Sequence, residues 1–69
     1  MKRVFNVEFD NGKPYTERFK GEKALLEGLT AFYDANKENS ICDAMVYENG
    51  NNITESQFIN EHIGGLLDD

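Results

Sequence analysis

The stretch YENGNNITESQF, residues 47–58, decides the fold because it carries the signals of two different structures. Asn49-Gly50 follows an acidic residue, and this pair is typical of a tight hairpin turn that returns the chain into another strand. Thr54 and Gln57 have the spacing of a capping box, in which two side chains satisfy unpaired N–H groups at the start of a helix. We interpret the stretch as the end of a strand followed by a helix.

The residues around and beyond Thr54 support this interpretation. Ile53 and Phe58 occupy the positions of a hydrophobic staple, which fixes the entry of the chain into a helix. Glu55 falls in the first turn, where the helix dipole favours an acid. In a strand, Phe58 and Ile59 would point to opposite faces. A helix instead places four residues on one face: Phe58, Ile59, His62 and Ile63.

Upstream, the alternation of apolar and polar residues predicts two strands. They cover residues 3–9 and 14–20 and are joined at Asn11-Gly12, a pair that tolerates the dihedral angles of a tight turn. Because Pro14 lacks an N–H group, we expect the second strand to lie at an edge of the sheet.

Residues 22–36 have the period of a helix, with an apolar arc too wide for a sheet alone to cover. Gly28 lies on the core side of this helix, where it lowers helix propensity by about 1 kcal/mol and indicates a close backbone approach. Residues 41–48 are predicted to form a third strand. The expected core combines residues of the helix and of the first strand: Leu25, Leu29, Phe32, Phe5, Val7 and Phe9.

These elements predict a single α+β domain over residues 1–69 with the order ββαβα. A crossover helix between the second and third strands places the first strand in the middle, so we expect an antiparallel sheet in the order 2-1-3, covered on one face by two helices. The alternative is a β-grasp-like ββαββ arrangement. Residues 64–69 are expected to form a flexible tail, in which Leu66 and Leu67 either seal the helix end or bind a partner.

The net charge of the chain is −6, and its distribution is uneven. All seven Lys and Arg lie in the first 37 residues together with six acids, whereas seven acids and no base follow from Glu38 onward. Nucleic acid is therefore not an expected ligand, because phosphate binding depends on Lys and Arg. A protein partner with a basic surface would fit this charge.

Cysteine usage and hydropathy indicate the compartment. With a single cysteine, Cys42, the chain forms no intramolecular disulfide, which favours a reducing environment. The N-terminal MKRVFNVEFD contains no apolar segment of a signal peptide. No apolar run approaches the roughly 20 residues of a membrane span. We expect a cytoplasmic protein that does not contact a membrane.

Catalytic motifs are not apparent in the sequence. Cys42 and His62 are the one nucleophile–base pair, and their spacing indicates no site. We expect Cys42 to pack as a small hydrophobic residue and His62 to lie on the apolar face of the second helix. The carboxylates lack the spacing of a calcium loop, and no glycine-rich nucleotide motif is present. We therefore expect no enzymatic activity, no cofactor and no metal.

The leading functional hypothesis is a small acidic protein-interaction module. It would be an accessory protein or inhibitor, of the kind that viruses and mobile elements encode, and its acidic half would bind a larger host protein and could imitate nucleic-acid phosphates. The alternative is a structural or housekeeping module that self-associates as a homodimer through the face or edge of its sheet. The carboxylates expected to reach solvent and bind the partner are Glu48, Glu55, Glu61, Asp68 and Asp69.

Overall fold

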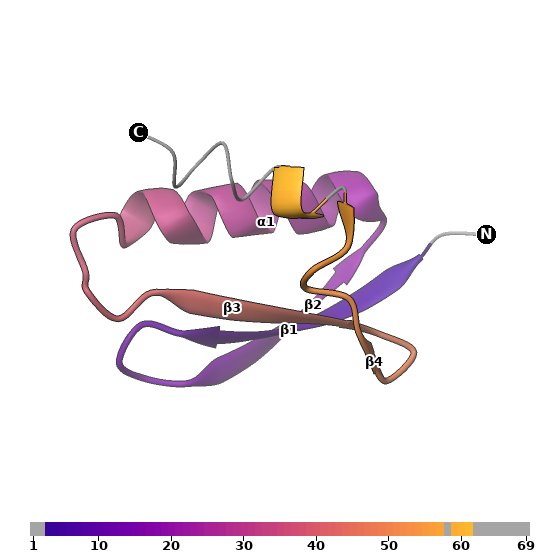
Figure 1. Ribbon diagram of the computed structural model, residues 1–69, viewed down its shortest axis with the longest axis horizontal. Helices are drawn as coiled ribbons and strands as arrows, with labels where there is room; N and C mark the ends of the chain where they lie inside the picture. Colours follow the sequence, from indigo (N-terminus) through magenta and orange to yellow (C-terminus); the bar gives the residue numbers. More distant parts are fainter. Residues whose placement is uncertain (1–2, 58, 62–69) are drawn as a thin grey trace.

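The computed structural model describes residues 3–57 and 59–61, which form one sheet with helical segments on one side (Figure 1). Within these residues the sheet has four strands in the order β2-β1-β3-β4, and every neighbouring pair is antiparallel. The elements in chain order are β1 (Val4–Asp10), β2 (Tyr15–Lys20), α1 (Glu22–Ala35), β3 (Asp43–Glu48) and β4 (Asn51–Asn52).

The predicted α+β class and the order of the first three strands are confirmed. The element order through β4 is the alternative ββαββ, so the prediction that the chain passes directly from the third strand to a helix is wrong. Residue 57 and residues 59–61 are nevertheless helical, and they follow the hairpin instead of replacing it.

The hairpin forms because Asn49-Gly50 adopts the dihedral angles that its sequence favours. Asn49 has φ 53° and Gly50 has φ 80°, the positive values that a tight two-residue turn requires at both central positions. Glu48 then pairs with Asn51, and Tyr47 pairs with Asn52. Two residues of β4 suffice to close this ladder, which leaves enough chain for a helical segment beyond it.

The predicted capping box at Thr54 is wrong, because the helical segment begins three residues later. The Thr54 hydroxyl accepts a hydrogen bond from the Val46 N–H at 2.9 Å and donates to Asn52 Oδ1 at 2.7 Å. Val46 lies on the edge of β3 that β4 has just left, so its N–H needs a substitute acceptor. The first turn of the helical segment instead includes the Asn60 N–H donating to the Ser56 carbonyl at 2.9 Å. Phe58, His62, Ile63 and the tail residues 64–69 lie outside the described residues.

The helix α1 packs across the sheet and begins at a sharp corner. Gly21, with φ 92°, ends β2 and caps α1, and its N–H donates to the Arg3 carbonyl at 2.6 Å. The third strand starts at Asp43, two residues later than predicted, because its partner β1 ends at Asp10, which pairs with Asp43. In the preceding loop, the Ile41 N–H donates to Asn39 Oδ1 at 3.0 Å. Ile41, in this loop, is 51% exposed.

The core lies between α1 and the sheet, as predicted. All six expected core residues are buried, each at most 5% exposed: Phe5, Val7, Phe9, Leu25, Leu29 and Phe32. Ile59, from the helical segment after β4, is also fully buried in this cluster. A second element therefore contacts the wide apolar arc of α1, as its sequence indicates.

The close approach predicted at Gly28 is found, and the neighbour there is the side-chain ring of Phe19 in β2, not a backbone segment. A Cβ atom added to Gly28 would lie 2.5 Å from Cζ of Phe19, which is shorter than any contact that a real methyl group tolerates. The ring of Phe19 thus occupies the space that a side chain at position 28 would need. Packing of this ring against α1 offsets the low helix propensity of glycine.

Candidate functional site

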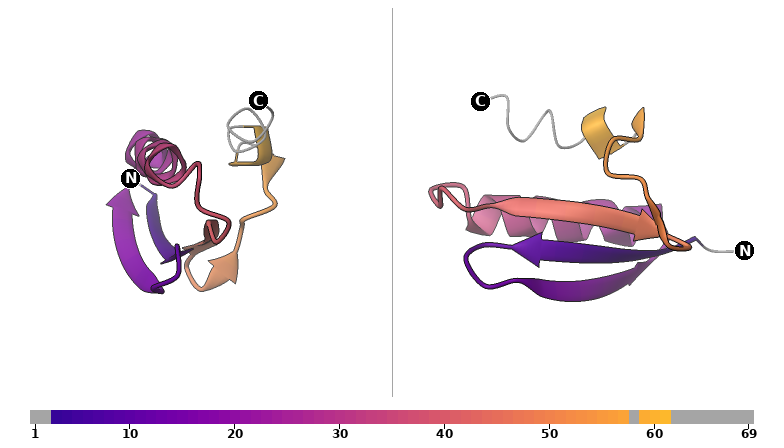
Figure 2. Two further views of the ribbon diagram at one scale, coloured as in Figure 1. Left: turned by 90° about the vertical axis from the view of Figure 1, so that its left-hand side faces the viewer. Right: turned by 60° about the horizontal axis from the view of Figure 1, so that its bottom comes forward.

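The outer edge of β3, within the acidic half of the chain, carries the candidate functional site. The Ile53 N–H donates to the Val46 carbonyl at 2.8 Å, so the even-numbered residues of β3 direct their backbone groups toward β4. After residue 53 the chain turns away from β3 toward the helical layer (Figure 2), and the edge around Ala44 is left without a neighbouring strand among the described residues. The departure of the chain opens a groove there.

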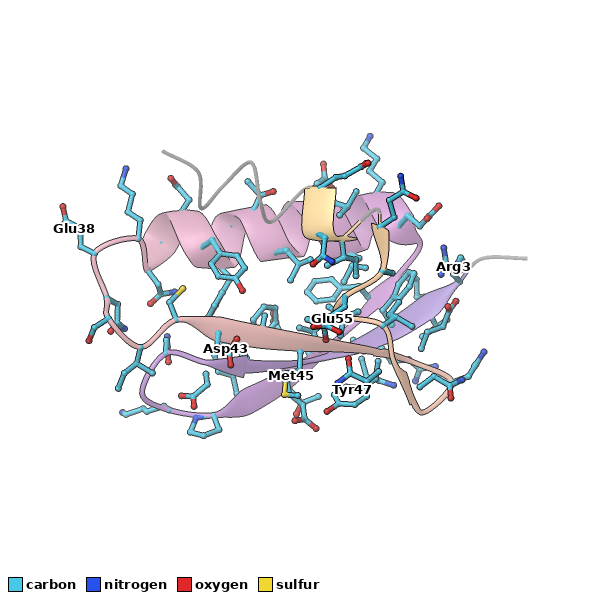
Figure 3. All side chains as sticks on the ribbon, in the orientation of Figure 1. Arg3, Glu38, Asp43, Met45, Tyr47 and Glu55 are labelled. Atoms are coloured by element: carbon cyan, nitrogen blue, oxygen red, sulfur yellow. The ribbon has the colours of Figure 1, made fainter. Side chains whose placement is uncertain are left out.

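This groove has a volume of about 490 Å³. We call it the acidic groove, and its lining comes from β3, β4 and the segment that follows: Asp43, Ala44, Met45, Asn52, Thr54 and Glu55. Figure 3 shows Asp43, Met45 and Glu55 around β3, while Arg3 lies toward one end of the molecule and Glu38 toward the other. The groove is thus formed by residues that are 12 positions apart at most in the sequence but belong to three segments.

Two exposed carboxylates flank the acidic groove. Neither Asp43 nor Glu55 forms an ion pair within the described part of the chain. Asp43 Oδ1 accepts a hydrogen bond from the Ala44 N–H at 3.0 Å, which occupies the outward-facing donor of this strand edge. A neutral N–H group does not neutralise the carboxylate, so Asp43 keeps its negative charge at this edge.

Met45 gives the acidic groove an apolar contact surface. Its side chain is 39% exposed, which is unusual for a methionine in a central part of a strand. The Tyr47 hydroxyl, one position further on the same face of the sheet, donates to Met45 Sδ at 3.9 Å. A flexible thioether between two carboxylates adapts readily to the shape of a partner.

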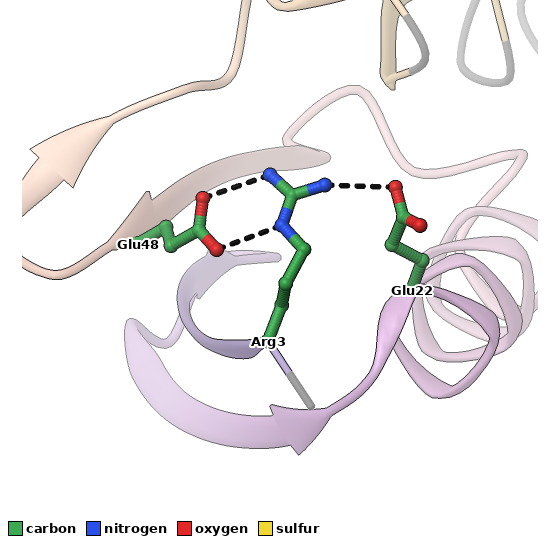
Figure 4. A network of polar contacts seen from close by, with 3 residues as sticks. All are labelled: Arg3, Glu22 and Glu48. Carbon is green, nitrogen blue, oxygen red and sulfur yellow. Dashed lines mark hydrogen bonds and ion pairs between the residues drawn. The ribbon is translucent and has the colours of Figure 1, made fainter. Parts of the chain in front are cut away.

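Glu48, the first predicted partner-binding residue, is engaged in an ion pair with Arg3 at the surface. Its two carboxylate oxygens accept hydrogen bonds from Nε and Nη2 of Arg3, each at 2.8 Å, and Arg3 Nη1 donates to Glu22 at 2.8 Å (Figure 4). The Glu48 side chain is 20% exposed. The hydrogen bonds and charge of Arg3 lower the pKa of the Glu48 carboxyl below its usual value. Glu48 therefore fastens β3 to the N-terminal strand and does not present a free charge.

The other predicted residues have different positions. Glu55 lies at the acidic groove, and Glu61 is exposed on the helical segment, where its carboxylate accepts a hydrogen bond from Gln57 Nε2 at 3.2 Å. Asp68 and Asp69 lie outside the described residues. Sequence reasoning did not select Asp43 and Met45, although their odd positions in a strand whose even positions are apolar place them on the open face.

The chemistry of Cys42 does not indicate a nucleophile. Cys42 is half-buried and packs against the core, as expected, and this burial together with the nearby Asp43 carboxylate raises the pKa of its thiol. The thiol is thus predominantly protonated at neutral pH, which lowers its nucleophilic reactivity. The predicted second member of the pair, His62, lies outside the described residues.

Two further structural observations apply to the described residues alone. No three His, Cys, Asp or Glu side chains in them come together in a way that could hold a metal ion. Nor does α1, at 14 residues, or any other helix in them have the length and apolar character to cross a membrane.

The chain matches no protein-family model, no curated protein and no solved structure in the comparisons. Its function is therefore inferred from the geometry and charge of its own surface.

Proposed function

We propose that this chain is a non-catalytic protein-interaction module that binds a basic surface of a larger protein through the acidic groove. The observation that carries this proposal is that two exposed carboxylates, Asp43 and Glu55, line the same groove as the exposed Met45. In the partner, Lys or Arg side chains would pair with the carboxylates, and an apolar group would cover the thioether.

The charge of this edge supports a role in partner selection. From Glu38 to the C-terminus the chain carries seven acids and no Lys or Arg, so the segments that line the acidic groove supply no Lys or Arg to offset Asp43 and Glu55. Such a field accelerates encounter with a basic partner and disfavours wrong partners, while the contacts at the centre of the interface set how slowly the complex dissociates. Glu61 extends this negative surface along the helical segment.

The same geometry supports an accessory or inhibitory role. A chain of 69 residues that occupies a basic groove on a larger protein would compete with whatever that groove normally binds, including nucleic acid. The acidic residues themselves disfavour direct binding of nucleic acid, because phosphate recognition depends on cations. The proposed partner is therefore a protein.

The test begins with affinity capture from a cell lysate at low and at high salt, followed by association kinetics with the purified partner. The double variant D43K/E55K should associate more slowly by about tenfold or more at low salt, and the difference should shrink as salt screens the charges. The matched control is E27K/E38K, which makes the same change of charge at two exposed positions away from the acidic groove. Both variants should fold, since exposed charges contribute less than about 1 kcal/mol each.

Two outcomes contradict the proposal. One is equal association rates of D43K/E55K and E27K/E38K at every ionic strength, which would reduce the acidic groove to a feature of solubility. The other is a chain that sediments as a stable homodimer and loses this state in D43K/E55K, which would assign the acidic groove to self-association.

A further inference from the structure

The opposite edge of the sheet, β2, presents a complete unpaired strand edge. Gly21 pairs with Arg3 through its N–H, so in the antiparallel register the odd-numbered residues of β2 direct their backbone groups toward β1. The N–H and C=O groups of Thr16, Arg18 and Lys20 therefore point away from the sheet, and within the described residues no strand lies beyond β2 (Figure 2). Six backbone groups are thus available for pairing with an added strand.

A groove runs between this edge and α1. Its volume is about 440 Å³, and its principal lining residues come from both elements: Tyr15, Glu17, Gly28, Ala31, Phe32 and Ala35. We call it the β2–α1 groove. The helix contributes small side chains, and the buried ring of Phe32 contributes an apolar surface, while Tyr15 is 42% exposed at the rim. An extended segment lying along β2 would therefore have room for every second side chain between β2 and α1.

The charges along β2 indicate which side chains such a segment would carry. Arg18 and Lys20 are exposed on the open face of the sheet and form no ion pair with any described residue. Acidic side chains on the added strand would lie beside them, since directly opposite residues in an antiparallel or parallel pair share a face. On the side of α1, the small apolar lining and the carboxylate of Glu17 favour uncharged, apolar side chains.

A second copy of this chain is a poor occupant of the edge. If two β2 strands paired antiparallel about a two-fold axis with their helices on the same face, the residue on the axis would face itself. In the two central registers that residue is Glu17 or Arg18, so each register places two like charges opposite one another. Like-charge contact in these two registers disfavours self-pairing of β2, so a different polypeptide fits this edge better.

We propose that the β2 edge and the β2–α1 groove bind an extended segment of another polypeptide, in which acidic residues alternate with small apolar residues, as a fifth strand of the sheet. Strand addition of this kind takes its affinity from backbone hydrogen bonds and its specificity from alternate side chains. This site lies on the edge opposite the acidic groove, has the opposite charge, and does not depend on the function proposed above.

The test uses synthetic peptides and backbone hydrogen exchange in the full chain, measured by NMR. The probe is an acetylated and amidated octapeptide of alternating glutamate and valine, and the control is the corresponding peptide of alternating lysine and valine. In the free protein, the amides of Thr16, Arg18 and Lys20 should exchange rapidly while those of Glu17 and Phe19 are protected by β1. Saturation with the glutamate peptide should slow exchange at the three even positions by about tenfold or more, as strand pairing requires.

Two variants assign the effect to the site. R18E should weaken binding of the glutamate peptide by about tenfold at low salt, whereas K37E, with the same change of charge at an exposed position on another segment, should bind almost normally. A31L/A35L fills the β2–α1 groove from two exposed helix positions and should weaken binding to a similar extent. Retained protection of Glu17 and Phe19 shows that each variant is folded.

Several results would overturn the inference. Unchanged exchange at Thr16, Arg18 and Lys20 with saturating glutamate peptide would exclude strand addition, and equal binding of the lysine peptide would exclude the charge preference. Protection of these amides that rises with protein concentration alone would assign the edge to a second copy of the chain. If D43K/E55K does not change partner binding, the function proposed for the acidic groove is contradicted, while the inference about the β2 edge is unaffected.

Discussion

Substitution of Gly28 by alanine separates the effect of helix propensity from the effect of packing, because the two predict opposite signs. Gly28 lies in the interior of α1, where alanine is more favourable than glycine by about 1 kcal/mol. If position 28 were exposed, G28A would therefore be more stable than the wild type.

The structure predicts destabilisation instead. The added Cβ would lie 2.5 Å from Cζ and 3.3 Å from Cδ1 of Phe19, so the whole ring must move. This ring packs edge-on against Phe9 with centroids 6.2 Å apart, and displacing it loosens the contact between β2 and α1. Overpacking of this kind costs about 1–3 kcal/mol, which outweighs the gain in propensity and leaves G28A less stable by about 1 kcal/mol.

The assay is urea unfolding of four proteins: the wild type, G28A, F19A and F19A/G28A. With the ring removed, alanine at position 28 should show its propensity and stabilise F19A by about 1 kcal/mol, which gives a coupling free energy of about 2 kcal/mol between the two positions. An increase of about 1 kcal/mol in the stability of G28A, with no coupling to Phe19, would refute the reasoning. It would show that the ring moves aside freely.

Three further predictions concern the core, the departure of the chain from β3, and pH. F32A should lower the free energy of unfolding by about 3–5 kcal/mol in thermal or urea unfolding, because the Phe32 ring is 5% exposed and lies 4.6 Å from that of Phe9; an unchanged melting curve would contradict this. T54V should cost about 1–2 kcal/mol, since it preserves shape but removes the acceptor of the Val46 N–H, and amide exchange at Val46 should accelerate. Arg3 lowers the pKa of Glu48 in the folded state, so this carboxylate contributes stability that is present above its unfolded pKa of about 4.3 and lost as pH falls through the lower folded value. The stability difference between wild type and E48Q should therefore be constant above about pH 5.5 and decline in acid, and a difference independent of pH would contradict the role of Arg3.

Much of the fold could be predicted because its signals are local and mutually consistent. The alternation around Phe5 and Phe9 and the helical period around Leu29 identified buried faces, and the glycine at position 28 identified a close contact, before any contact was known. The site could be predicted less well. Glu55 lies at the acidic groove as an exposed acid, but Glu48 is engaged by Arg3, 45 residues away in the sequence, and no local pattern indicates that pairing.

The sequence by itself determined the antiparallel order of the first three strands, the helix that covers them and the concentration of acids in the second half, because these depend on periodicity, turn chemistry and composition. Only the tertiary structure decided that the stretch of residues 47–58 forms a hairpin at Asn49-Gly50 and that the helical segment begins after it. Asn49-Gly50 and the residues before Phe58 carry valid signals for a hairpin and for a helix, and a local comparison treats the two as competitors. Both form in succession, because the ladder with β3 needs two residues of β4, after which the Val46 N–H takes the Thr54 hydroxyl as its acceptor. That hydrogen bond joins residues eight positions apart across the hairpin and moves the helix start beyond Thr54, and the chain that turns away with it opens the acidic groove on β3.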